Sequence, residues 1–420
     1  MIIHNKRKVM SAARTLAKES SLFNPVEIVT PRNFAELSDE KSFTPTFEYD
    51  TEYLENIVSK KQPIIDAANC IFDNCAPEAK ADEIISDITE FRVDEILASI
   101  GMAEGLLGKD DAETFVYARS KYGMPPSYVT AEAENLAKGG MYRFDASARG
   151  SIVSKATMLK LMDLSMDAKQ VSENFRQAMC YLEMAPWRTI ITENCAAIDV
   201  RDRSSEGDSI IFIPAKKARK GDDLLSLAAH EIYGHAFSSN NARVFFDNIL
   251  RDTPLSPLTL LLAKTDNEVL YEGVAKTYDV AVKGEKSLPK PWATTAIKYA
   301  RCGNNFTQVA EAIMEMRKKS GVSEESARTM AWTTTYRIFR GSTNPMENKE
   351  SRYVFPKDAA YFWGYKKAQE YKNQPIFALY SSMKIEEIKR LSKAFPAMNA
   401  IPQQFDLERF VNHMIDCMLG

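Results

Sequence analysis

The sequence predicts an α+β protein that is mostly helical and has one small antiparallel sheet. Three observations support this fold class. Apolar residues recur at helical spacing through most of the 420 residues. Three short runs rich in β-branched residues stand close together between residues 187 and 215. The helix expected directly after them carries two of the four histidines of the chain. We therefore expect the sheet to lie beside that helix.

The first part of the chain is predicted to be helical. A helix is expected over Lys6–Glu19, followed by a connection that contains Pro25 and Pro31. Residues 43–50 hold a proline and three aromatic residues, a composition that favours extended backbone. Helical periodicity then runs through 51–138 and 151–184.

The pattern changes to short strands at residue 187. Strands are expected over Trp187–Glu193, Ala197–Asp202 and Ser209–Ala215, because turn residues separate these β-rich runs. Connections this short favour antiparallel pairing. Helices resume at Asp222–Phe237 and continue to the C-terminus, interrupted by a polar loop.

This order of elements gives a three-part organisation. We expect an N-terminal helix and linker over 1–40, a catalytic domain over 41–375 and C-terminal helices over 376–420. Within the catalytic domain, 41–185 is the helical first part, and 186–375 holds the sheet and the metal helices.

Composition argues against several classes of protein. The net charge of −3 is too small to indicate a nucleic-acid or membrane-surface partner. A membrane span is not expected, because no stretch approaches the ~18 apolar residues that one needs. The N-terminus lacks the apolar run of an export signal. Six scattered cysteines without a C-x-x-C pair suggest free thiols in a reducing compartment, so we expect a cytoplasmic protein.

A metal-binding motif is the strongest local signal. His230 and His235 flank Glu231 in the pattern H-E-x-x-x-H. Imidazole suits zinc, and a carboxylate beside the first histidine can act as general base on a water molecule. The alternative is an ordinary core helix with one buried and one exposed histidine.

The spacing of these histidines requires a distorted helix. Residues five apart on an ideal α-helix point about 140° away from each other, so both could not hold one ion. A π-type bulge would bring them to the same face. Gly234 lowers the cost of such a distortion.

A catalytic zinc also needs a third protein ligand. Glu268 and Glu272 follow on the next expected helix at i and i+4, which places them on one face. One could bind the metal while the other orients a histidine. The alternative is a solvated acidic face.

Three blocks of the chain resemble the tubulin tyrosine carboxypeptidase family and its bacterial relatives with a Q-E-G-L-A motif. They are HEIYGH (230–235), YEGVA (271–275) and FPKDAAYFWG (355–364). The metal helix of that family reads roughly H-E-I-G-T-H, with the same i+5 spacing. Weaker similarity extends to residues 43–50, to residues 122–126 and to the expected strands, so the resemblance covers roughly residues 40 to 370. The chain departs from the family at Tyr233 and Gly234, where the family has Gly and then Thr.

The resemblance implies a zinc-peptidase-like core and a zinc-dependent metallopeptidase. His230, His235 and Glu272 would hold Zn²⁺, and Glu231 would be the general base. The implied activity is that of a carboxypeptidase, which removes the C-terminal residue from a peptide or protein tail.

Substrate contacts are expected in the third block and in the sheet. Tyr361 could stabilise the oxyanion, unless it is a core aromatic. Arg337, Arg340 and Lys357 are candidates to bind the terminal carboxylate, and the alternative for them is surface salt bridges. The strand Ser209–Ala215 could pair with an extended peptide.

Two other classes of function stay open. One is a zinc endopeptidase or another metallohydrolase, whose groove would be open at both ends rather than closed by a cation. The other is a non-catalytic regulator that retains the fold, against which the intact Glu231 argues.

Overall fold

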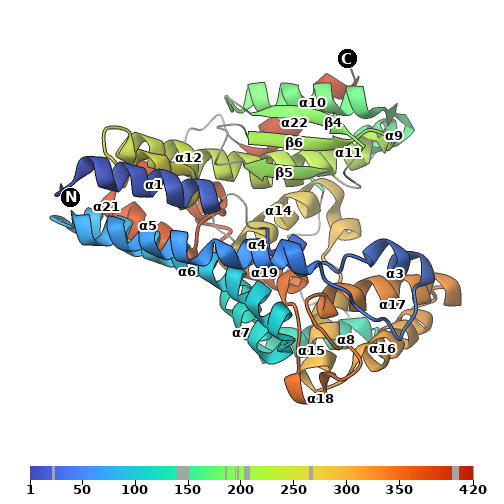
Figure 1. The fold of residues 1–420 in the computed structure, drawn as a ribbon. Coiled ribbons are helices and arrows are strands. Elements are labelled where there is room, and N and C mark those ends of the chain that lie inside the picture. The colour runs from blue at the N-terminus through green and yellow to red at the C-terminus, as the bar shows by residue number, and fades with distance from the viewer. Residues whose placement is uncertain are drawn as a thin grey trace.

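The computed structural model describes residues 1–20, 24–139, 151–184, 187–193, 195, 198–202, 209–263, 268–399 and 406–419. These residues form a mostly helical fold with small sheets, which confirms the helical part of the prediction. An upper layer contains the three-stranded sheet, and a larger helical body lies below it (Figure 1).

The helical body begins with the N-terminal third of the chain. Its elements are β1 (Ile2–Ile3), α1 (Lys6–Ser20), α2 (Pro25–Ile28), α3 (Phe34–Glu40), α4 (Thr51–Ser59), α5 (Lys61–Asn74), β2 (Cys75–Ala76), α6 (Lys80–Gly108), α7 (Asp111–Tyr122) and α8 (Ser127–Ala137). The helix predicted at Lys6–Glu19 is therefore confirmed by α1, whose apolar face packs on α5. The strands β1 and β2 pair antiparallel.

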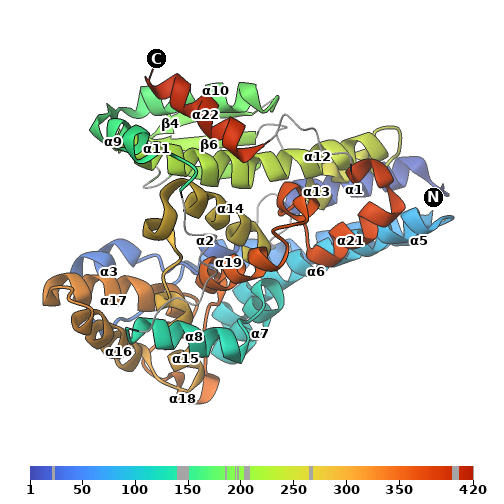
Figure 2. The ribbon, with the colours of Figure 1, turned by 180° about the vertical axis from the view of Figure 1, so that it is seen from behind.

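The upper layer is built from the middle of the chain and the last helix. Its elements are α9 (Lys155–Asp163), β3 (Ser165–Met166), α10 (Ala168–Tyr181), β4 (Arg188–Thr192), β5 (Asp199–Asp202), β6 (Ser209–Pro214), β7 (Arg219–Lys220), α11 (Gly221–Leu227), η2 (Ala228–Ala236), α12 (Phe237–Leu250) and α22 (Leu407–Leu419). Helix α10 packs against β4 and β6, and α22 packs against α10 (Figures 1 and 2).

The rest of the chain returns to the lower body. Its elements are η3 (Ser256–Leu258), α13 (Thr259–Ala263), α14 (Glu268–Lys283), η4 (Gly284–Ser287), α15 (Trp292–Arg301), α16 (Phe306–Lys319), α17 (Glu324–Phe339), α18 (Asn348–Ser351), η5 (Lys357–Ala359), α19 (Ala360–Glu370), α20 (Pro375–Leu379), α21 (Ile385–Ala394) and η6 (Pro396–Asn399). Helix α14 lies between the two layers (Figure 2).

The three predicted strands exist, but their predicted antiparallel arrangement is wrong in part. The strand order is β4-β6-β5, with β4 parallel and β5 antiparallel to β6. The central place of β6 has a physical reason. After Ser209, its sequence IIFIP is a continuous apolar run, and the strand is buried on both faces, as central strands are.

The central place of β6 also overturns one expected substrate contact. Both edges of β6 are already paired, by β4 and by β5. The strand Ser209–Ala215 therefore has no edge free to bind an extended peptide.

Two apolar cores correspond to the two layers. The upper core joins the sheet with α10, α11, η2 and α22, while the larger core joins α1, α5, α6 and the helices around α16 and α17. Tyr278 of α14 packs against both cores. Helix α14 is thus held on both sides.

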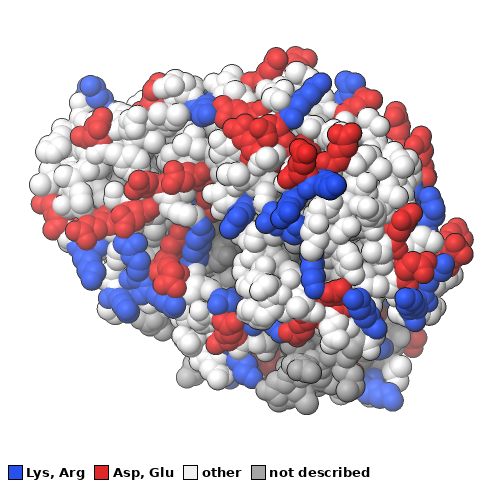
Figure 3. Space-filling model, turned by 90° about the horizontal axis from the view of Figure 1, so that it is seen from below, with Lys and Arg blue, Asp and Glu red and all other residues white. Residues whose placement is uncertain are grey.

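The surface matches the near-neutral composition. On the face seen in Figure 3, acidic and basic side chains are interspersed over the molecule. None of the helices that the structure describes is long and apolar enough to cross a membrane.

Candidate metal centre

The metal helix contains the distortion that its motif requires. The chain is helical from Gly221 to Leu250, and its middle segment, Ala228–Ala236, is a π-helix. In a π-helix the backbone bonds run from i to i+5, so residues five apart lie on one face. His230 and His235 therefore face the same point, and the predicted bulge around Gly234 is confirmed.

Glu272 of α14 completes a three-residue cluster. Its Oε2 lies 3.5 Å from Nε2 of His230 and 3.5 Å from Nε2 of His235. One ligand atom from each residue lies within 4.8 Å of the others. Ligands about 2.0–2.1 Å from a tetrahedral zinc stand about 3.3 Å apart, and the two separations of 3.5 Å are close to that value. The side chain of Glu268 lies outside the described part of the chain.

Polar atoms left over in the cluster support a bound cation. Glu272 Oε2 and His235 Nδ1 are buried, and neither makes an ordinary hydrogen bond with a described residue. A buried carboxylate is costly unless a positive charge compensates it. Two imidazoles and one carboxylate are also the donor set of many zinc hydrolases. The residues therefore fit a zinc ion.

The pKa shifts within the cluster also support a bound cation. Burial alone would raise the pKa of Glu272, but His235 and His230 hold that pKa well below its usual range. Burial alone would lower the pKa of His230, but Glu272 and Glu231 outweigh it and raise that pKa. The cluster thus attracts a positive charge, and a metal ion would replace the proton on the imidazole.

Small residues set the distance between the ligand-bearing helices. A Cβ added to Gly234 would lie 2.7 Å from Cβ of Ala275, so η2 and α14 approach closely. A Cβ added to Gly273 would lie 2.0 Å from the carbonyl oxygen of Gly364, so α14 and α19 approach even more closely. Helix α14 is packed between η2 and α19, and this packing places Glu272 opposite the histidines. The three blocks quoted from the sequence are therefore in contact.

Asp279 is a supporting residue that sequence reasoning missed. Its carboxylate accepts hydrogen bonds from Ser226 of the metal helix, from Ser287 at 2.9 Å and from Lys276 at 2.5 Å. Burial opposes ionisation, but Lys276 and Ser226 lower the pKa of Asp279. These bonds tie α14 to α11. The available signal was its position seven residues after Glu272, on the same helix face.

Tyr271 is a second supporting residue. Its ring centroid lies 4.0 Å from that of His235, and its hydroxyl is 3.0 Å from Oγ of Ser239. The hydroxyl contact fixes the ring, and the ring restricts the rotation of the imidazole. Tyr271 immediately precedes Glu272, so one short segment supplies one member of the cluster and a support for another.

The predicted catalytic base lies beside the cluster. Glu231 is half-buried on the π-helix, and it is near enough to His230 to help raise the pKa of that imidazole. Its catalytic role stays a prediction.

The predicted substrate residues divide into two groups. Arg340 is buried, with Nη2 2.8 Å from Asp358 Oδ2 and its guanidinium 4.7 Å from the Phe355 ring centroid. Arg337 is exposed and lies 3.1 Å from the same carboxylate. Arg337 and Tyr361 line a cavity, whereas Arg340 and half-buried Lys357 are absent from its lining. The roles of all four residues stay predictions.

Comparison with known proteins adds no identification. Neither a protein-family model nor a curated protein matches this chain. What is established here is a buried His-His-Glu group that could hold a metal ion. Any assignment of function therefore depends on the chemistry of this group and on the motifs around it.

Proposed function

We propose that the protein is a zinc-dependent metallopeptidase, and specifically a carboxypeptidase related to the tubulin tyrosine carboxypeptidases. The observation that carries the proposal is the convergence of His230, His235 and Glu272 on one point, with Glu231 adjacent. This is a three-ligand set with a carboxylate in the position of a general base.

The residues divide the chemistry of peptide hydrolysis between them. Zinc, when bound, would act as a Lewis acid that polarises the scissile carbonyl group and acidifies a water molecule. Glu231 would accept the proton of the attacking water and pass it to the leaving amine. Tyr361 would donate a hydrogen bond to the developing oxyanion.

The family assignment draws support from packing as well as from motifs. The glycine of the first block contacts the alanine of the second, and the glycine of the second contacts the glycine of the third. Residues far apart in the chain thus allow the helices around Glu272 to pack closely.

Metal content and peptide cleavage test the proposal together. Wild type should bind one zinc per chain and cleave peptides, while His235→Ala should lose both properties. Glu231→Gln should keep the zinc and lose the cleavage, because it removes only the general base. His4→Ala is the matched control, because His4 is exposed and lies outside the cluster. A wild type that binds no metal would refute the proposal.

The same assay separates the two alternatives. Cleavage that survives amidation of the peptide C-terminus would indicate an endopeptidase, because no free carboxylate is then needed. A protein that binds zinc in the cluster and cleaves no peptide would be a non-catalytic regulator or a hydrolase of another substrate.

A further inference from the structure

A cavity of about 590 Å³ is lined in part by α14, the helix that also carries Glu272, and its function is unassigned. Its lining includes Lys276, one helical turn after Glu272 on α14, and Tyr361 of α19. Four residues of helix rise about 6 Å, so this edge of the cavity lies about two extended residues from Glu272 along the helix axis. Its other walls come from the segment after η4 and from α16 and α17.

The lining of this cavity is strongly basic. It contains the cations Lys276, Lys286, Lys290, Arg317 and Arg337, against the single acid Asp358. Two of these charges are compensated, because Lys276 pairs with Asp279 and Arg337 pairs with Asp358. Among the described residues, Arg317, Lys286 and Lys290 form no ion pair.

Arg317 is the most unusual of the three. Its guanidinium stacks on Trp292 at 4.3 Å from the ring centroid, and its Nη1 lies 3.1 Å from the sulfur of Met330. Its Nε is buried and has no hydrogen-bond partner within the described part of the chain. Burial lowers its pKa to about 10, with no carboxylate to offset this effect. It is therefore a charged, half-buried arginine that pairs with no carboxylate among the described residues.

The rest of the wall is apolar. Leu288, Pro289, Ala293 and Met330 line the cavity together with the Trp292 ring. A ligand that fits must combine a negative charge with an apolar portion. Guanidinium groups bind carboxylates through paired hydrogen bonds, and stacking on an aromatic ring holds the guanidinium in place.

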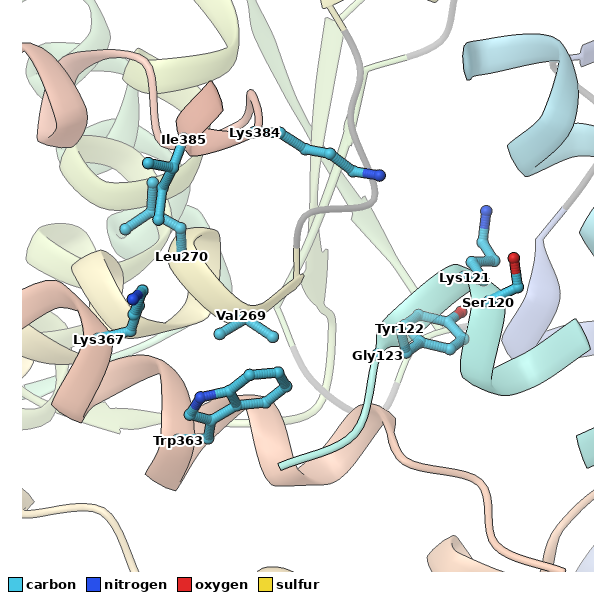
Figure 4. Close-up of a pocket in the computed structure, with 10 residues that line it drawn as sticks. All are labelled: Ser120, Lys121, Tyr122, Gly123, Val269, Leu270, Trp363, Lys367, Lys384 and Ile385. Carbon is cyan, nitrogen blue, oxygen red and sulfur yellow. The ribbon is translucent and has the colours of Figure 1, made fainter. Parts of the chain in front are cut away.

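A second cavity nearby shows how different this arrangement is. It measures about 290 Å³, and its lining also includes lysines. Lys384 and Trp363 reach from one side toward Tyr122 and Lys121 on the other (Figure 4). Here the cations are engaged by the protein: Lys384 lies 3.4 Å from Glu95 and Lys367 lies 2.7 Å from Glu370.

We propose that the basic cavity binds a carboxylate group of the peptide substrate, with Arg317 as its principal contact. Lys286 and Lys290 add positive charge, and the Trp292 wall takes the apolar part of the same residue. This inference rests on the proposed peptidase function and deepens it. It assigns carboxylate recognition to Arg317 in place of Arg340, whose charge Asp358 already engages.

Direct binding tests the cavity without requiring catalysis. The probes are N-acetyl-phenylalanine and its amide, titrated by calorimetry into the zinc-loaded full chain. Wild type should bind the acid at least about 10-fold more tightly than the amide, as expected for a charge-assisted hydrogen bond. Arg317→Gln should abolish the difference, and Arg317→Lys should restore part of it. Lys319→Gln, an exposed cation on the same helix, should behave as wild type.

Turnover then identifies the source of the carboxylate. Three peptides are compared: one with a free C-terminus, its amide, and an amidated peptide that carries a glutamate side chain. Arg317→Gln should raise KM about 10-fold or more for the recognised acid and leave kcat nearly unchanged.

The binding and turnover experiments together distinguish failure of the cavity assignment from failure of the peptidase proposal. Equal binding of acid and amide by wild type, or unchanged discrimination in Arg317→Gln, would overturn the cavity assignment even if peptides are cleaved. Arg317-dependent binding without cleavage of any peptide would sustain the carboxylate site and refute the peptidase function. Thermal unfolding of each variant shows whether a loss of binding comes from a loss of fold.

Discussion

Replacing Gly273 by alanine should damage both the stability of the protein and its metal affinity. The new Cβ would lie 2.0 Å from the carbonyl oxygen of Gly364 and 2.8 Å from its Cα. Real Cβ contacts essentially never fall below 3.0 Å, so α14 and α19 must separate by about 1 Å (3.0 minus 2.0). Backbone offers no flexible side chain that could yield instead.

The magnitude follows from two opposing effects. Overpacking of this kind costs about 1–3 kcal/mol, while alanine gains up to about 1 kcal/mol over glycine within a helix. We expect the free energy of unfolding to fall by roughly 1–2 kcal/mol. Because Glu272 is the preceding residue, its carboxylate should move away from the histidines, and zinc affinity should fall about 10-fold or more.

The assay is urea denaturation combined with zinc titration against a competing chelator. Gly108→Ala is the matched control, because no atom lies within 4 Å of a Cβ added at that helical glycine. That variant should be as stable as wild type or slightly more stable, with unchanged zinc affinity. If Gly273→Ala matched wild type in both measurements, the close approach of α14 to α19 would not position Glu272.

Three further predictions follow from the packing and the charges. Asp279→Asn should weaken zinc binding about 10-fold in the same titration, because Asp279 ties the two ligand-bearing helices together, and unchanged affinity would contradict its positioning role. Glu387→Ala should lower the free energy of unfolding by about 1.5–3 kcal/mol, because it removes the carboxylate 2.8 Å from buried Arg92 while Glu95 stays 3.3 Å away, whereas exposed Glu386→Ala should cost at most ~1 kcal/mol. Lys138 and Lys298 lower the pKa of Glu134 to about 2, so the stability that this carboxylate contributes is present above pH 4.5 and is lost as the pH falls toward 2. The difference in unfolding free energy between wild type and Glu134→Gln should shrink over that interval, and a constant difference would contradict the assignment.

Local signals in the sequence were sufficient for the histidine pair of the cluster and for the main elements. The i+5 spacing of His230 and His235 led to a π-helix because no other regular helix brings such residues to one face. Spacing on the next helix left Glu268 and Glu272 as alternatives, and only the family resemblance of YEGVA favoured Glu272. The three strands came from short β-rich runs between turn residues. Each of these inferences depends on residues that are close together in the chain.

Only the tertiary structure decided how distant segments meet. The antiparallel sheet was mispredicted because strand order depends on which run is buried on both faces, and the continuous apolar run of β6 took the centre. The contact between Gly273 and Gly364, the bonds of Asp279 to Ser226 and Ser287, and the pairing of Arg340 with Asp358 all join separate elements. Periodicity and spacing describe neighbours along the chain, whereas burial and charge compensation depend on distances in space, so the surroundings of the metal ligands became visible only in the folded molecule.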